Sequence, residues 1–382
     1  MLRITSSLND QIAVQKMSPS QYIEFLDHQA KLAFEKAFLN HAKNGLGLKW
    51  VSGVPVGVVT DPEKYKTHLI RTTNCDERFA QLEIESLELQ GPEHFGEQVL
   101  RCRDVVSQCA ATISDRPDLH EFKFSKVPVD LTILPFFNAG AGPVPKGGDI
   151  VLVHQGLMWL DTWMSCWHLC SWNDQILDRD SEMMIIRASL PALARTILGI
   201  AEPKDGFVAI KLTAISALMN MEQQLLAFIA ESYAWQFILL HEFGHIALGH
   251  TQTLRRWRPE HELSRAKLAA RRAEMREFES AADLFAVKHF PPPAMRRSGS
   301  TLKPAYDLLV PVLAALFGLF RLGEQPQDGD DRDDDHRDGP GSDHPPAAER
   351  FRDVLAAFKL SVDLKPIISL ISDLPTRCAT AR

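Results

Sequence analysis

The stretch FILLHEFGHIALGH, residues 237–250, decides what fold and what chemistry this chain can have. Residues four apart lie on one face of an α-helix, so His241 and His245 can direct their imidazoles at one metal ion, with Glu242 beside them. The flanking residues are almost all apolar, and two histidines and a glutamate on a buried helix are costly unless they are satisfied. The spacing predicts a metal-binding catalytic helix; a core helix with incidental histidines is the alternative.

Two neutral imidazoles and a carboxylate suit zinc and leave the fourth tetrahedral position for water. Zinc acidifies that water, and an adjacent base, here Glu242, can take its proton. A third histidine in HExxHxxGxxH register is missing, because Leu248 and Thr251 stand at the glycine and histidine positions. His250 is therefore interpreted as a helix-end residue and not as a ligand.

The third ligand is expected from the downstream segment FESAADLFAVKHF, residues 278–290. Glu279 and Asp283 lie one helical turn apart there. Glu279 is the candidate zinc ligand, and Asp283 is expected to accept the free N–H of a ligand histidine and fix its tautomer. The competing carboxylates are Glu262, Glu274 and Glu277.

Composition limits the class of protein. The chain has 382 residues, is 45% hydrophobic and carries a net charge of −7, which gives no overall attraction for nucleic acid or anionic lipid. Its six cysteines form no CxxC pair and no apolar leader precedes them, so reduced thiols in a cytoplasm are expected. The most apolar stretch, residues 308–320, is shorter than the roughly 20 residues of a membrane span and predicts a buried helix.

Periodicity predicts an α+β fold that is mostly helical. An amphipathic helix is expected over residues 18–45, with Gly45 as its terminator, and residues 50–125 are only assigned as mixed α/β. Residues 127–158 predict a hairpin-like unit of two strands joined by a Gly/Pro loop, whose edge precedes the HExxH helix. The predicted divisions are an N-terminal region, a metallopeptidase core, an acidic disordered insertion and a C-terminal helical part, at residues 1–125, 126–323, 324–346 and 347–382.

Four segments together, HEFGH, ESAAD, FNAG…GGDIVLVHQGL and DHPPAAERFRDVL, resemble zinc metallopeptidases of the HtpX and CAAX-prenyl-protease type. The pairing of HExxH with a downstream glutamate is also similar to soluble ImmA/IrrE-type and Lit-type bacterial peptidases. The resemblance covers roughly residues 130 to 360 and implies a zincin-like fold in which Asn138 and Ala139 lie close to the substrate. Membrane-embedded relatives differ from this chain, which has no credible span, so the soluble relatives are the better comparison.

Hydrolysis of a peptide bond also needs a donor for the negative oxygen of the tetrahedral intermediate. His344 is the candidate, because an imidazole can donate a hydrogen bond near neutral pH. Alternatively, His344 is only a solvated loop residue, because it borders the acidic insertion. Arg350 could also be the donor, or could pair with Asp283 or Glu349.

The sequence thus predicts a cytoplasmic zinc endopeptidase of the glutamate-zincin kind that cuts a protein or peptide substrate. Neither nucleic-acid binding nor stable membrane insertion is expected, and nothing predicts an oligomeric state. The alternatives are a non-catalytic regulatory or sensor protein that keeps the zincin fold, and a small-peptide aminopeptidase.

Overall fold

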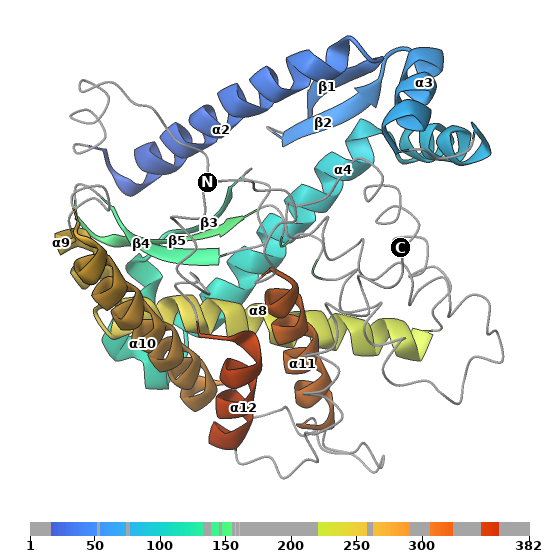
Figure 1. The fold of residues 1–382 in the computed structure, drawn as a ribbon. Coiled ribbons are helices and arrows are strands. Elements are labelled where there is room, and N and C mark those ends of the chain that lie inside the picture. The colour runs from blue at the N-terminus through green and yellow to red at the C-terminus, as the bar shows by residue number, and fades with distance from the viewer. Residues whose placement is uncertain are drawn as a thin grey trace. The chain divides into compact units, whose positions relative to one another are not determined.

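The computed structural model is mostly helical with a small mixed sheet, which fits the α+β class (Figure 1). The described residues up to residue 160 belong to one compact unit, and those from residue 221 onward belong to a second. The structure describes residues 17–51, 54–73, 77–132, 139–144, 147–154, 157, 160, 221–257, 263–290, 306–323 and 345–358.

The first unit begins with the expected helix, α2 (Pro19–Ala42). Proline suits the first helical position because its missing N–H needs no partner there, and the Ser18 hydroxyl accepts a hydrogen bond from the backbone N–H of Gln21 at 3.4 Å. Gly45 follows with a φ of 80°, and a Cβ at this position would collide with the Asp61 carbonyl oxygen. The chain can reverse at this point only because Gly45 has no side chain.

Residues 46–126 form a hairpin followed by helices, and this region includes residues 50–125, which were only assigned as mixed α/β. The strands β1 and β2 pair antiparallel, and α4 is a single helix of 38 residues. A small core of Tyr65, Ala80 and Ile84 joins the helices. The elements are β1 (Leu46–Val51), β2 (Val54–Val59), α3 (Pro62–Thr73), α4 (Glu77–Ser114) and the 3-10 turns η1 (Pro117–Phe122) and η2 (Phe124–Lys126).

The prediction of a hairpin over residues 127–158 is wrong, because its two strands do not pair antiparallel. The strands at its two ends, β3 (Val129–Thr132) and β5 (Asp149–His154), run parallel. The segment assigned as a Gly/Pro loop contains a strand of its own, β4 (Ala139–Pro143), which pairs antiparallel with β5. The strand order is β3-β5-β4, so β4 forms an edge, and its proline stands at the strand's last residue, where a missing N–H does least damage.

The second unit is built on α8 (Met221–Ala247), the helix that carries HExxH. Every residue from Phe237 to His245 is buried, because α10 and α11 pack against α8 and α12 packs against both of them (Figure 1). The remaining elements of this unit are α9 (His250–Arg256), α10 (Arg265–His289), α11 (Tyr306–Gly323) and α12 (Ala347–Ala357).

The apolar segment 308–320 forms a buried helix, as predicted. It lies within α11, and its Phe317 is fully buried and contacts the rings of Phe237 and Phe351. Among the described residues, no helix has the length and apolar character that crossing a membrane requires. The helix therefore serves as core for α8 and α12.

Several predictions fall on residues outside the described ranges. These are the substrate-strand residue Asn138, the oxyanion candidate His344, the competing ligand Glu262, and residues 324–344 of the acidic insertion that was predicted over 324–346. The predicted division of the chain at residues 125, 323 and 346 likewise stays a prediction.

Candidate metal centre

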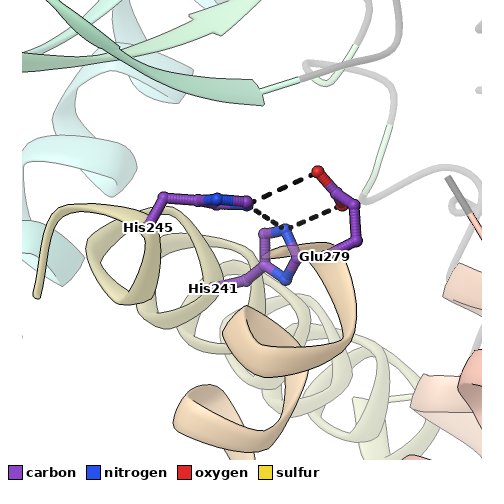
Figure 2. Close-up of side chains that lie close together, drawn as sticks. All are labelled: His241, His245 and Glu279. Carbon is purple, nitrogen blue, oxygen red and sulfur yellow. Dashed lines mark hydrogen bonds and ion pairs between the residues drawn. The ribbon is translucent and has the colours of Figure 1, made fainter. Parts of the chain in front are cut away.

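Three side chains from two helices converge in the second unit. His241 and His245 come from α8 and Glu279 from α10, and each is less than a tenth exposed (Figure 2). The two Nε2 atoms lie 3.1 Å apart. The Glu279 carboxylate faces both rings, with Oε2 3.3 Å from His241 Nε2 and Oε1 3.5 Å from His245 Nε2.

These separations fit a metal ion. Ligand atoms at tetrahedral corners, each about 2.0–2.1 Å from zinc, are roughly 3.3 Å from one another. The three separations of 3.1, 3.3 and 3.5 Å lie around that value. Within the part of the chain that the structure describes, this His-His-Glu group could hold a metal ion through three protein donors, which leaves a coordination position for water.

His241 is held from behind by a carboxylate. Its Nδ1 lies 2.9 Å from Asp283 Oδ1. Arg350 of α12 donates to the same carboxylate twice, from Nε to Oδ2 at 2.7 Å and from Nη2 to Oδ1 at 2.8 Å. Arg350 therefore makes the pairing with Asp283, which is one of the roles that the sequence allowed for it.

The charges of this cluster support one another. Burial by itself raises the pKa of Asp283, but the charge and hydrogen bonds of Arg350, together with the bond to His241, bring it below its usual value. Burial likewise opposes the charge of Arg350, and Asp283, Glu279 and Glu242 outweigh it and raise the pKa of the guanidinium. Asp283 is thus a buried anion, and it accepts the Nδ1–H of His241 and leaves Nε2 to face the other donors.

His241 and His245 differ in how readily they bind a proton. Burial lowers the pKa of His241, but its bonds to Asp283 and Glu279 prevail and raise it to about 10. Burial and the neighbouring charge of His241 lower the pKa of His245 to about 3. Without an ion, His241 therefore carries the additional proton and is positively charged at neutral pH, whereas His245 stays neutral.

His250 is the residue of this cluster whose part sequence reasoning missed. It lies at a helix end, as predicted, because it begins α9, but it is only 7% exposed, and its Nδ1 lies 3.0 Å from Nδ1 of His245. Gly249, with a φ of 76°, turns the chain between α8 and α9, and His250 is the first residue after that turn. A glycine-histidine pair directly behind the HExxH helix was the available signal.

Two features of α8 shape the site further. Glu242 is 6% exposed and follows a ligand candidate directly, and its negative charge acts on Arg350. Gly244 lets α10 approach closely, because a Cβ there would lie 3.1 Å from atoms of the Phe285 side chain. This close helix contact brings Glu279 within reach of the imidazoles.

The other candidate residues lie elsewhere. Glu277 is exposed and Glu274 is half-buried on α10, and neither belongs to the His-His-Glu group. Ala139 lies in β4 of the first unit, where it pairs with Val153. Asn138 and His344 are among the residues that the structure leaves undescribed.

Comparison with known proteins gives a match to a protein family. Residues 213–368 are similar to a protein family described as Peptidase U49. No curated protein and no solved structure matches the chain. The family match covers less than half of the chain, but it spans α8 to α12 and all three donors of the candidate metal centre. It supports a peptidase function for this part of the protein.

Proposed function

We propose that this chain is a zinc-dependent endopeptidase that acts on a protein substrate in the cytoplasm. The observation that carries the proposal is the convergence of His241, His245 and Glu279 at separations that suit tetrahedral zinc. The similarity to a peptidase family over the same helices supports peptide-bond hydrolysis as the reaction.

Each residue of the cluster has a distinct task in this proposal. Zinc, when bound by the three donors, supplies Lewis acidity that polarises a peptide carbonyl and lowers the pKa of water. Glu242 accepts the proton of the attacking water and later returns it to the leaving amine. Asp283, kept anionic by Arg350, holds His241 in the tautomer that offers Nε2 to the ion.

Substrate binding and oxyanion stabilisation rest on the sequence alone. The proposal assigns the strand containing Asn138 and Ala139 as the edge on which an extended substrate adds main-chain hydrogen bonds. His344 is the proposed donor to the oxyanion. Arg350 is less suited to this task, because its Nε and Nη2 already donate to Asp283.

The decisive test is the variant Glu242→Gln. It keeps the size of the side chain and removes the base, so hydrolysis should fall by about 10²–10⁴-fold while zinc stays bound. The probes are unfolded casein and a library of peptides blocked at both ends, with cleavage followed by mass spectrometry and zinc by elemental analysis. Glu277→Gln, an exposed carboxylate on α10, is the matched control and should cleave like the wild type.

The alternatives give other outcomes. Zinc-loaded wild type that cleaves neither probe, or Glu242→Gln protein that cleaves as fast as wild type, would contradict the proposed mechanism and favour a non-catalytic binding protein. If the blocked peptides resist cleavage and the same peptides with free N-termini are cleaved, the protein is an aminopeptidase instead.

A further inference from the structure

His250 makes a contact that the proposed catalytic set does not explain. Its imidazole is buried, follows the turn at Gly249, and meets the ring of His245 on the edge opposite Glu279. The two rings touch through their Nδ1 atoms at 3.0 Å, which is hydrogen-bond distance. One of the two nitrogens must therefore donate and the other must accept.

The direction of this hydrogen bond follows from the metal site. If His245 binds an ion through Nε2, that atom offers its lone pair, and the hydrogen of the neutral ring must sit on Nδ1. His245 then donates from Nδ1, and His250 accepts at its own Nδ1. In the reverse arrangement, His245 would carry its hydrogen on Nε2 and could not bind the ion there.

The orientation of His250 is fixed by an aromatic stack. Its ring lies on Phe278 with centroids 4.1 Å apart and planes 8° from parallel. Phe278 stacks in turn on Trp257 at 6.2 Å and 12°, and the Arg271 guanidinium lies 4.1 Å from the centre of the Trp257 ring. Because Phe278 directly precedes Glu279, the same turn of α10 supplies a ligand and the surface that orients His250.

We propose that His250 is a positioning residue that accepts the Nδ1–H of His245 and thereby sets the tautomer in which His245 binds the metal. The inference deepens the proposed function and rests on it, because the direction of the hydrogen bond depends on metal binding at His245 Nε2. His250 itself contacts neither the ion nor the substrate in this assignment.

Two substitutions separate the hydrogen bond from the stack. His250→Phe keeps an aromatic ring on Phe278 and removes the acceptor, whereas His250→Asn removes the ring and keeps an acceptor near the place of Nδ1. Zinc dissociation constants are measured by competition with a chromogenic chelator on the full-length protein. His250→Phe, which lacks the acceptor, should weaken zinc binding by about 10–100-fold. His250→Asn, which keeps an acceptor, should bind zinc within about threefold of wild type. His289→Phe, a buried histidine on α10 outside the metal group, is the control.

Any other ranking overturns the proposal. Equal losses in both variants, or a larger loss in His250→Asn, would mean that packing matters and the acceptor does not; wild-type affinity in both would mean that neither does. A second measurement needs no variant with altered packing: ¹H–¹⁵N spectra of zinc-loaded wild type should place the His245 hydrogen on Nδ1, and a hydrogen on Nε2 contradicts the proposal. If wild-type protein binds no zinc, the proposed function fails first; if it binds zinc and cleaves while the His250 variants match it, only this inference fails.

Discussion

The two imidazoles of the candidate site come from one helix, yet their surroundings differ in charge. Behind His241 stands an anion, Asp283, whose charge is offset by Arg350. Behind His245 stands a neutral ring, His250, and burial is the main reason that the pKa of His250 is lowered to about 4. An aromatic ring supports each side: on the His241 side the Arg350 guanidinium lies 5.5 Å from the centre of Phe317, and on the His245 side His250 stacks on Phe278.

The difference teaches how one buried site can hold two ligands without accumulating charge. A carboxylate partner makes a ligand imidazole more basic, but a buried carboxylate is costly unless a cation pairs with it. One such partner already requires Arg350, contributed by α12. A neutral partner can fix the second tautomer without a further counter-ion, which suits a cluster that already contains the carboxylates of Glu242 and Glu279.

The largest effect is expected on the charged side. Asp283→Ala leaves Arg350 buried without its bidentate partner and should lower the free energy of unfolding by about 3–5 kcal/mol. The double variant Asp283→Ala with Arg350→Met removes both charges and should regain much of that loss. Chemical denaturation of the metal-free proteins measures both. Additive losses in the double variant would mean that the pair is not energetically coupled, contrary to the geometry.

The opposite pKa shifts of the two ligands predict how pH acts on metal binding. At pH 8, His241 carries a proton because its pKa is about 10, whereas His245, with a pKa of about 3, does not. Zinc binding should release about one proton, and affinity should rise about tenfold per pH unit towards pH 10. Calorimetry in buffers of different ionisation enthalpy measures the release, and Asp283→Asn should reduce it. No released proton in the wild type would contradict the assigned difference.

The stability of the metal-free protein follows from the same shifts. His241 has a folded pKa above its usual 6.5, so its stabilising contribution is complete below pH 6.5 and is lost as pH rises towards 10. His245 and His250 have lowered pKa values, so they destabilise the fold as pH falls from 6.5 towards 3–4. Together, these three histidines make their contribution to the free energy of unfolding largest near pH 6.5.

The smallest effects are expected from the two aromatic supports. Phe317→Leu alters a fully buried ring and should cost about 1–3 kcal/mol of stability with little change in zinc affinity. Phe278→Leu removes the stack beneath His250 at a half-buried position and should weaken zinc binding a few-fold, by roughly 0.5–1 kcal/mol, with less loss of stability. Thermal unfolding measures the stability of both variants, and chelator competition measures their zinc affinity. Equal losses of stability and of zinc affinity in the two variants would contradict the prediction.

The sequence predicted much of the helical part of this arrangement. Capping residues and periodicity predicted α2, the apolar stretch 308–320 predicted α11, and the C-terminal region was predicted to be helical, as α12 is. The four-residue spacing predicted that His241 and His245 share one helix face, since helical geometry puts such residues side by side. The carboxylates downstream supplied the candidates for a third ligand. Their metal binding stays a proposal.

The features that sequence reasoning missed depend on turns and tertiary pairing. β4 was assigned as loop because Ala139–Pro143 is rich in glycine and ends in proline; its pairing with β5 overrides that weak propensity. His250 was set aside as a ligand because it is out of register with the HExxHxxGxxH pattern, and its contact with His245 was not foreseen. Its burial depends on the left-handed turn at Gly249 and on Phe278, which lies 28 residues further along the chain.

The central claim is that Glu279 completes a metal site begun by His241 and His245. The most direct test is elemental analysis of purified full-length protein, wild type against Glu279→Ala, with Glu277→Ala as the control on the same helix. The account predicts about one zinc per chain in wild type and control and its loss in Glu279→Ala. Zinc retained at the wild-type level in Glu279→Ala, or absent from the wild type, would contradict it.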